Sequence, residues 1–245
     1  MKELIDIHSH ILPGVDDGAD SFEMSMRMLK CAADDGISGM ILTPHNKPGH
    51  RHTHLPEVAC RADKLREMTA EENIHIELYL GSELYYRSGL LEELESGLAG
   101  TMAGSRYVLV EFGPLSDFDY IRSGIYSLLT GGYYPILAHV ERYQNVCSQK
   151  YGIDDLIEMG CYIQVNAGSI MGKSGSKVKR FVKNILKQRQ VHFVATDAHD
   201  LGKRAPYLSD CADYIRKKYG EDYCRKLFCE NPLHVVRDKE TALYL

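Results

Sequence analysis

Seven short apolar segments rich in β-branched residues recur along the chain, and longer segments with helical spacing separate them. This alternation is typical of parallel α/β folds, because each helix carries the chain back to the start of the next strand. A capping box, Asp20-Ser21-Phe22-Glu23, opens the first helix. Strands are expected at 4–7, 39–43, 74–80, 107–111, 134–138, 161–165 and 191–195, and helices at about 21–33, 55–72, 117–130, 153–159, 175–189 and 206–218.

Each expected strand ends on a polar residue, and six of the seven supply a side chain that binds metals well. In a parallel barrel the carboxyl ends of all strands meet on one face, where active sites lie. An open doubly wound sheet would spread the same residues along an edge. The chain also has 245 residues and no linker-like stretch, and closed barrels typically have about 250. The sequence therefore predicts a single α/β domain, residues 1–245, with a barrel of seven strands.

The candidate metal ligands are histidines and carboxylates. His8 and His10 are two residues apart, so that both side chains point to the same side of an extended strand, and Asp197 and His199 repeat this spacing. A glycine-flanked loop containing Asp16 and Asp17 can fold a carboxylate toward the same place. The full set is His8, His10, Asp17, His45, Glu83, Glu111, His139, Asp197 and His199.

Nine nitrogen and oxygen ligands are more than one ion uses, which indicates two or three ions with bridging carboxylates. No cysteine belongs to the set, which argues against structural zinc. The share of carboxylates favours Mn²⁺, with Fe, Zn or Mg as alternatives.

The other histidines are expected to have no ligand role. His75, His192 and His234 fall in strand or tail patterns and are interpreted as structural or exposed. Three more alternate in the segment 48–54, at positions 50, 52 and 54, where a solvated loop is favoured over a lining of the site mouth.

Composition excludes several classes of protein. The net charge is −5 and the pI about 6.1, so that no nucleic-acid partner is indicated. No apolar run reaches the ~20 residues of a membrane helix, and therefore no membrane insertion is expected. The N-terminus enters a strand pattern at once, and the seven cysteines form no CxxC pair. We interpret the protein as cytoplasmic with reduced thiols.

Several motifs occur together in this order: IDIHSHILPGVDDGA near the start, TPH at 43–45, GSELYY at 81–86, VEF at 110–112, LAHVERY at 137–143, QVNAGSI at 164–170 and ATDAHD at 195–200. With these motifs the sequence resembles the PHP (polymerase and histidinol phosphatase) superfamily over almost its whole length. It resembles most the bacterial manganese-dependent protein-tyrosine phosphatases encoded with capsule and exopolysaccharide genes.

The resemblance implies a distorted seven-stranded (β/α) barrel with a trinuclear metal centre held by the nine residues above, Glu83 being the bridge. It also implies that Arg142 and Arg204 contact phosphate. The implied substrate is the phosphorylated, tyrosine-rich tail of a membrane-associated bacterial tyrosine kinase, whose dephosphorylation regulates polysaccharide export. This chain departs from the pattern at Asn46, where many relatives have a second histidine.

Phosphate monoester hydrolysis requires charge neutralisation, positioning and an activated water. A multinuclear centre supplies all three, because a bound water becomes hydroxide near neutral pH and attacks phosphorus in line. Forked hydrogen bonds from the two arginines would hold the remaining oxygens. Asp200 and His45 are candidates to protonate the leaving group.

A thiol mechanism is suggested only by the Cys-x5-Arg spacing of Cys60 and Arg66. The five intervening residues contain no glycine and fall in a helical pattern, whereas a phosphate-binding loop requires exposed backbone N–H groups. The spacing is therefore interpreted as coincidence. Tyrosines near strand ends, at 85, 86, 133, 134 and 143, are expected either to line a phosphotyrosine pocket or simply to pack.

Three alternative functions remain open. A small-molecule phosphatase of the histidinol-phosphate type would use the same site on another substrate. A PHP phosphodiesterase or nuclease is disfavoured by the acidic balance of the chain. A non-catalytic metal-binding regulator is disfavoured by the intact ligand set and by the two arginines.

Overall fold

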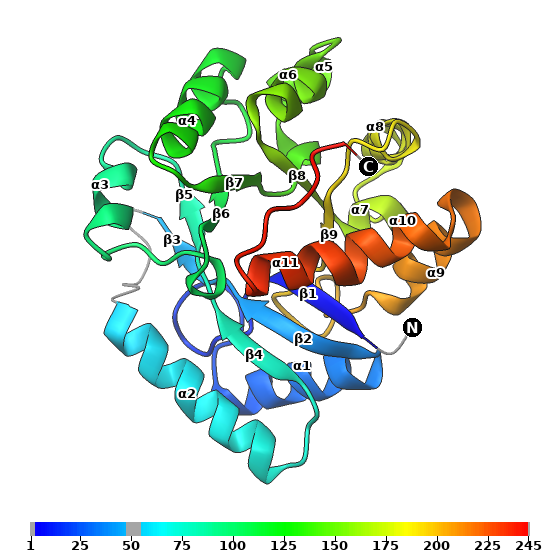
Figure 1. Ribbon diagram of the computed structural model, residues 1–245. Helices are drawn as coiled ribbons and strands as arrows, with labels where there is room; N and C mark the ends of the chain where they lie inside the picture. Colours follow the sequence, from blue (N-terminus) through cyan, green and yellow to red (C-terminus); the bar gives the residue numbers. More distant parts are fainter. Residues whose placement is uncertain (1–2, 48–54, 245) are drawn as a thin grey trace.

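The computed structural model describes residues 3–47 and 55–244, and its strands are all parallel. Three strands form one sheet in the order β1-β2-β4, and six form another in the order β3-β5-β6-β7-β8-β9. Figure 1 shows that the sheets curl around a common centre with helices outside them. The strands are β1 (Leu4–Ser9), β2 (Ile37–Leu42), β3 (His45–Asn46), β4 (Glu77–Leu80), β5 (Glu83–Tyr85), β6 (Tyr107–Glu111), β7 (Tyr134–Leu137), β8 (Tyr162–Asn166) and β9 (Phe193–Ala195).

The described residues thus contain nine strands, not the seven expected, although every expected segment contains a strand. The difference arises because the short strand β3 follows β2 directly and the short strand β5 follows β4 directly. Backbone hydrogen bonds continue across these junctions, from Gly81 N to Leu42 O at 2.8 Å and from Glu83 N to Pro44 O at 3.1 Å. The 3₁₀ turn η1 (Met102–Gly104) packs against both β4 and β6.

The first and last strands also meet. Ser9 forms an isolated parallel bridge with Ala198, and the backbone N–H of His10 donates to Ala198 O at 2.8 Å. The residues that follow β1 and β9 are therefore hydrogen-bonded to each other. Together the strands form a curled parallel sheet.

Six helices lie where the sequence predicts them, within three residues at each end. Ser21 is the N-cap of the first, and its side chain accepts a hydrogen bond from the Met24 N–H at 3.3 Å. These helices are α1 (Phe22–Asp34), α2 (Leu55–Glu71), α4 (Phe118–Thr130), α6 (Gly152–Met159), α8 (Ser176–Lys187) and α9 (Ser209–Tyr219). Short elements that the sequence analysis did not predict are α3 (Leu90–Glu95), η2 (Val140–Arg142), α5 (Gln144–Ser148), α7 (Ala167–Met171), α10 (Glu221–Arg225), the π-helical turn η3 (Lys226–Glu230) and α11 (Asn231–Val236).

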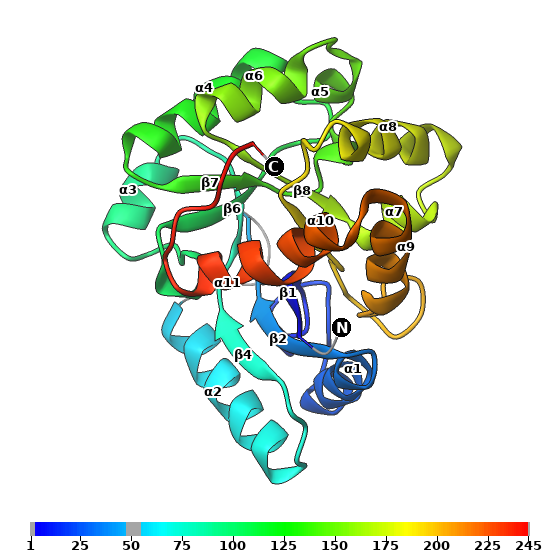
Figure 2. The ribbon, with the colours of Figure 1, turned by 45° about the vertical axis from the view of Figure 1, so that its right-hand side comes forward.

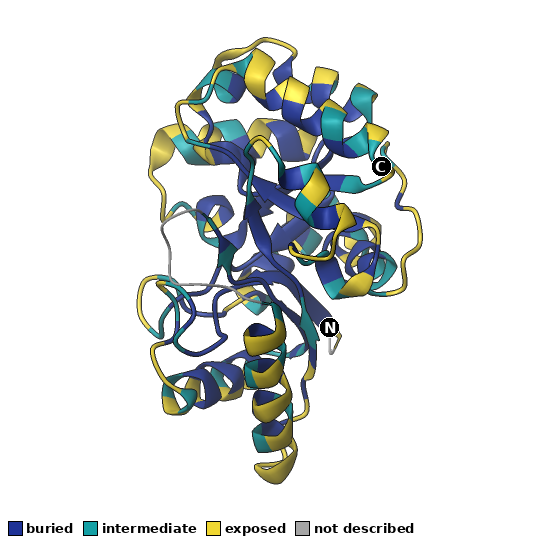
Figure 3. Cartoon of the chain, turned by 90° about the vertical axis from the view of Figure 1, so that its left-hand side faces the viewer, coloured by how far each residue is buried: buried dark blue, intermediate teal, exposed yellow. Residues whose placement is uncertain are grey.

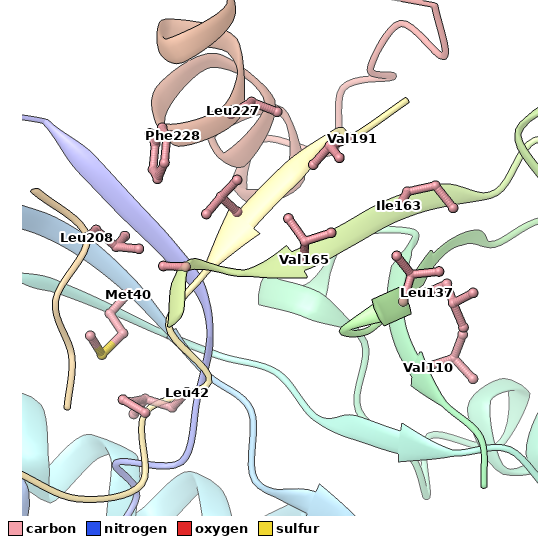
Figure 4. Packing of buried hydrophobic residues seen from close by; sticks show 14 of the residues in the cluster. Met40, Leu42, Val110, Leu137, Ile163, Val165, Val191, Leu208, Leu227 and Phe228 are labelled. Carbon is pink, nitrogen blue, oxygen red and sulfur yellow. The ribbon is translucent and has the colours of Figure 1, made fainter. Parts of the chain in front are cut away.

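Apart from β4, the strands of four or more residues are buried on both faces for most of their length, which explains their apolar character. In β6, Tyr107 and Leu109 belong to a cluster inside the curled sheet, and Val108 and Val110 to a larger cluster beneath the helices. Figure 4 shows part of the larger cluster, where Phe228 and Leu227 lie over the strands. Exposed residues gather on the outer faces of the helices (Figure 3). No helix in the described part of the chain is long and apolar enough to cross a membrane.

The C-terminal segment covers the amino ends of several strands, as its red trace in Figure 2 shows. The Tyr107 hydroxyl donates to Lys239 O and the Tyr162 hydroxyl to Thr241 O, both at 2.8 Å. The C-terminal segment therefore lies at the end of the sheet opposite the carboxyl ends of the strands, where the polar side chains gather.

Candidate metal centre

The structure brings all nine candidate ligands together at the carboxyl ends of the strands. They form four overlapping groups, and within each group the potential ligand atoms lie within 4.8 Å of one another. The groups are His8, His10 and Asp197; His8, Glu83 and His139; His45, Glu83 and Glu111; and His10, Asp17, His45 and His199. Because the groups share members, the arrangement suits several neighbouring ions better than a single one.

One buried group consists of side chains at the ends of β1 and β9. The Nε2 atoms of His8 and His10 are 3.2 Å apart, and Asp197 Oδ1 lies 3.6 and 3.4 Å from them. All three side chains are buried. Two imidazole nitrogens that face each other and a carboxylate at this distance form a donor set that could hold one divalent ion.

Glu83, at the start of β5, occupies the middle of the cluster. Its Oε2 lies 3.3 Å from His8 Nε2, 3.2 Å from His10 Nε2 and 2.9 Å from His45 Nδ1. Its Oε1 lies 2.7 Å from His139 Nε2. A carboxylate surrounded in this way by histidines from different groups has the position that a bridging ligand requires.

The remaining ligands form the outer part of the cluster. Asp17 Oδ1 is 3.4 Å from Nε2 of both His45 and His199. Glu111 Oε1 is 3.4 Å from His45 Nδ1. The Asp17 side chain is 57% exposed, whereas that of Glu83 is 1% exposed, so that the cluster opens toward solvent on the Asp17 side.

Electrostatics keep the buried carboxylates Glu83 and Asp197 ionised. Burial alone would raise the pKa of Glu83 and of Asp197, but His8 and the hydrogen-bonding histidines around them lower both pKa values well below the ordinary range. Burial opposes protonation of His45, yet its contacts with Glu111 and Glu83 raise its pKa to about 9. Burial and the charge of His10 lower the pKa of His199 to about 3. Metal binding must therefore displace protons from some histidines of the cluster.

The residues fit divalent metal ions. Glu83 Oε2, Glu111 Oε1 and His199 Nε2 are buried and face other candidate ligands at 2.9–3.4 Å without a well-formed hydrogen bond among the described residues. Buried polar atoms that lack good hydrogen bonds are costly and therefore uncommon. Coordination to ions would satisfy all three, and the donors are imidazole nitrogens and carboxylate oxygens, which suit Mn, Fe and Zn.

Two of the nine residues have unusual backbone conformations. His139 has φ 34° and Asp197 has φ 54°, both in the left-handed region that residues with a Cβ seldom adopt. Such conformations cost about 1–3 kcal/mol each and cluster at functional sites. Here they direct the second residue after β7 and the second residue after β9 into the cluster.

Asp16 supports the cluster, and the sequence analysis did not assign it a role. Its side chain is fully buried; Oδ2 accepts from His10 Nδ1 at 2.7 Å and from the His45 N–H at 3.1 Å. Its neighbour Asp17 lies among the candidate ligands. Asp16 therefore orients His10 so that Nε2 faces the other ligands.

Two polar residues on β8 hold the opposite side. Gln164 Oε1 lies 3.2 Å from His8 Nδ1 and accepts from the His139 N–H at 2.7 Å. Asn166 Nδ2 donates to Asp197 Oδ2 at 2.8 Å, and Gln164 Nε2 donates to Asn166 Oδ1 at the same distance. Gln164 and Asn166 are two residues apart, so that both side chains point to the same side of β8, which itself supplies no candidate metal ligand. This spacing was the signal in the sequence that they support the ligands of neighbouring strands.

The two arginines predicted to contact phosphate meet beside the cluster. Arg204 Nη2 donates to Asp197 Oδ1 at 2.6 Å, and Arg142 Nη2 donates to Asp197 Oδ2. Their side chains are 35% and 41% exposed, and both line a cavity of about 630 Å³. Each guanidinium group thus lies between the cluster and solvent.

Asp200 organises the loop that carries Arg204. Its Oδ1 accepts from the N–H groups of Gly202 at 2.6 Å and Arg204 at 3.1 Å. Burial alone would raise the pKa of Asp200, but these hydrogen bonds, together with the charge of Arg204, lower it below its usual value. These contacts favour a role in holding the loop over donation of a proton.

Other residues considered from the sequence lie away from the cluster or outside the described residues. His75 is exposed, His192 is buried near the C-terminal segment and His234 is half-buried on α11. Positions 50, 52 and 54 fall outside the described ranges. Of the tyrosines, the buried Tyr143 packs against the His139 ring at 5.9 Å, whereas Tyr134 contacts Tyr107 at the far end of the sheet.

The Cys-x5-Arg spacing has no phosphate loop. Cys60 and Arg66 both lie within the helix α2, where backbone N–H groups are used by the helix. The Arg66 side chain donates to Leu78 O at 2.9 Å and pairs with Asp63. This arrangement excludes a thiol-based phosphatase site at Cys60.

Comparison with known proteins identifies the family. The model of a family described as capsular polysaccharide synthesis, CpsB/CapC, matches residues 4–237. The chain belongs to the CpsB/CapC family. This CpsB/CapC protein is 34% identical over 241 residues to tyrosine-protein phosphatase CpsB of Streptococcus pneumoniae, and the alignment covers 96% of this chain and 99% of that relative. It is 30% identical over 223 residues to tyrosine-protein phosphatase YwqE of Bacillus subtilis, and this alignment covers 89% of this chain and 86% of the relative.

A solved structure agrees. The CpsB/CapC chain matches a structure from work on YwqE of Bacillus subtilis and CpsB of Streptococcus pneumoniae, which are described as metal-dependent tyrosine phosphatases. The TM-score is 0.92 and the sequence identity 29%, and the match covers 98% of this chain and 96% of the other. The resemblance to capsule-linked tyrosine phosphatases inferred from the sequence is thereby confirmed.

Proposed function

We propose that this CpsB/CapC protein is a metal-dependent phosphoric monoester hydrolase that removes phosphate from tyrosine residues of proteins. The observation that carries the proposal is the convergence of nine His, Asp and Glu side chains beside two arginines. The relatives that share its full length are named tyrosine-protein phosphatases.

We propose that the site holds two or three ions, with Mn²⁺ favoured over Fe, Zn or Mg because carboxylates make up four of the nine ligands. The ions would be held by His8, His10, Asp17, His45, Glu83, Glu111, His139, Asp197 and His199. When bound, they supply Lewis acidity toward the phosphoryl group and lower the pKa of water.

The chain itself supplies positioning. Arg142 and Arg204 each present donors on the solvent side of Asp197, where forked hydrogen bonds can bind phosphoryl oxygens. These contacts would strengthen as charge develops on the oxygens in the transition state. Asp200 keeps the Arg204 loop in place, and phenolate is a good enough leaving group that a strong general acid is dispensable.

The wider context is also a proposal. We infer that residues 1–245 act as one distorted PHP-type barrel, counting β2 with β3 and β4 with β5 as single interrupted strands. The hydrogen bonds between neighbouring strand ends support this, including the Ser9–Ala198 bridge. The implied substrate is the tyrosine-rich tail of a membrane-associated kinase of capsule synthesis, and the seven free cysteines suit action in the reducing cytoplasm.

The test is phosphate release from a phosphotyrosine peptide by protein that has been chelated and then supplied with Mn²⁺. Activity should return with Mn²⁺ in the wild type and in Cys60→Ser, and should be lost in His139→Ala. Histidinol phosphate, assayed in parallel, separates the small-molecule alternative. Metal-independent activity, or faster hydrolysis of histidinol phosphate than of the peptide, would contradict the proposal.

A further inference from the structure

A groove leads away from the two arginines. The cavity of about 630 Å³ beside the metal centre adjoins a second cavity of about 840 Å³. Arg142, Ser169 and Ser174 line both, so that the two cavities lie next to each other. We call the two together the α8 groove, because η2, α5, α7 and the first turns of α8 line its outer part. Figure 2 shows α5 and α8 on the same side of the molecule.

Four cations line the α8 groove beyond the arginines. Lys173 and Lys203 line its inner part, and Lys177 and Arg180 line its outer part. All four are exposed, and within the described ranges none forms an ion pair with a carboxylate. Elsewhere on the surface, arginines such as Arg216 are paired with acids. The groove therefore has uncompensated positive charge.

Little negative charge opposes it. Among the described lining residues the acid is Glu141, which is buried and whose Oε1 accepts from the Asn166 N–H at 2.9 Å. The outer part also contains apolar surface from Pro114, Val178 and Phe181. A polyanion that carries carbon-rich side chains matches this lining, and an acidic polypeptide in extended conformation has both features.

We propose that the α8 groove binds the substrate chain on one side of the phosphotyrosine and selects substrates with acidic residues there. The inference rests on the proposed function, because it takes the phosphotyrosine to be bound between the metal centre and Arg142. The residues next along the chain then enter the groove. Successive residues of an extended chain advance about 3.3 Å, so that carboxylates a few residues from the phosphotyrosine meet Lys177 and Arg180. Charge complementarity of this kind contributes to selectivity and to the rate of association.

The test compares two phosphotyrosine peptides that differ only in having three Glu or three Gln residues on one side of the phosphotyrosine, each made in both orientations. The readout is the ratio of kcat/KM for the Glu and Gln peptides, which does not depend on the fraction of active enzyme. For the wild type at low ionic strength the ratio should be roughly five to ten in one orientation, mainly through KM, and should fall toward one at high salt.

Two double variants with the same change in charge separate the groove from general electrostatics. In Lys177→Glu/Arg180→Glu the ratio should fall to one or below. In Lys183→Glu/Lys187→Glu, on exposed positions of α8 outside the groove, the ratio should stay that of the wild type. The neutral pairs Lys177→Gln/Arg180→Gln and Lys183→Gln/Lys187→Gln give the same comparison if charge reversal prevents folding.

Distinct outcomes overturn distinct claims. Failure to hydrolyse any phosphotyrosine peptide with Mn²⁺ present refutes the proposed function. Hydrolysis with a ratio near one in both orientations, or equal loss in both double variants, refutes the groove alone. Inhibition of the wild type by a single-stranded oligonucleotide that is stronger than inhibition by the Glu peptide would assign the groove to nucleic acid instead.

Discussion

Replacing Asp16 with asparagine is expected to weaken metal binding, although Asp16 is not itself a proposed ligand. The carboxylate is fully buried and accepts hydrogen bonds from His10 Nδ1 at 2.7 Å, the His45 N–H at 3.1 Å and the Gly18 N–H at 3.0 Å. Burial alone would raise its pKa, but the bond to His10 lowers the pKa below the usual value, so that Asp16 is ionised. Asp16 thus fixes the orientation of the His10 ring and makes its Nε2 atom a stronger metal ligand.

The size of the effect follows from these contacts. A hydrogen bond to a charged group contributes about 1.5–3 kcal/mol. Asparagine can still accept hydrogen bonds but has no negative charge, so that the strengthening of His10 is lost. Loss of such supporting contacts typically weakens metal affinity by about 10- to 100-fold, which corresponds to about 1.4–2.8 kcal/mol.

The assay is calorimetric titration of Mn²⁺ into chelated protein, with phosphate release measured over the same range of Mn²⁺. Asp16→Asn should require about 10- to 100-fold more Mn²⁺ for half-maximal binding and activity. Asp20→Asn is the matched control, since it makes the same change at an exposed position of the same loop. Equal Mn²⁺ affinity in Asp16→Asn and the wild type would refute the role assigned to Asp16.

Three further predictions follow from other contacts. Arg204→Lys should lower kcat/KM about 10- to 100-fold while Mn²⁺ content is unchanged, because lysine keeps the charge but loses the fork; unchanged kinetics would contradict this. Gly18→Ala should lower both the melting temperature and the Mn²⁺ affinity, because a Cβ there would lie 1.9 Å from the His10 carbonyl oxygen; a melting temperature equal to that of the wild type would count against it. Burial lowers the pKa of His192 from 6.5 to about 4, so that between these pH values the unfolded chain binds a proton that the folded chain does not. The free energy of unfolding should therefore decrease by about 3 kcal/mol as the pH falls from about 6.5 to 4. Urea unfolding should show a smaller decrease in the free energy of unfolding for His192→Gln over this range, and an equal decrease in both proteins would exclude the effect.

The positions of the candidate ligands could be predicted because they depend on a general property of parallel sheets. Whatever the details of the strands, their carboxyl ends lie on one side, so that His8, His45 and Glu83 come together although they are far apart in the sequence. The helical spacing of the segments between the strands also identified six helices with small errors at their ends.

The short strands β3 and β5 that follow β2 and β4 could not be predicted. Thr43-Pro44 and Gly81-Ser82 end the apolar runs, and whether strand pairing resumes after them depends on partners elsewhere in the chain. Thr43 Oγ1, for example, accepts from the Ser9 N–H at 3.0 Å, and Gly81 lies against Ile41 and Met102. Long-range contacts of this kind leave no periodic signal.

The roles of neighbouring acids were equally hidden. Asp16 and Asp17 are adjacent and chemically identical, so that only the folded loop distinguishes them. Its hydrogen bonds with the Gly18 and His45 N–H groups turn Asp16 inward, and Asp17 remains at the rim near His199. Gln164 and Asn166 had a recognisable spacing, but their contacts depend on β7 and β9 lying on either side of β8.

The central claim is that the nine side chains at the carboxyl ends of the strands hold the catalytic ions. Anomalous diffraction at the manganese edge from crystals of Mn²⁺-loaded protein tests it most directly. The account predicts two or three peaks within the cluster, one of them beside both Glu83 and His139, and loss of that peak in His139→Ala. Manganese bound elsewhere on the chain, with no peak in the cluster of a fully active preparation, would contradict it.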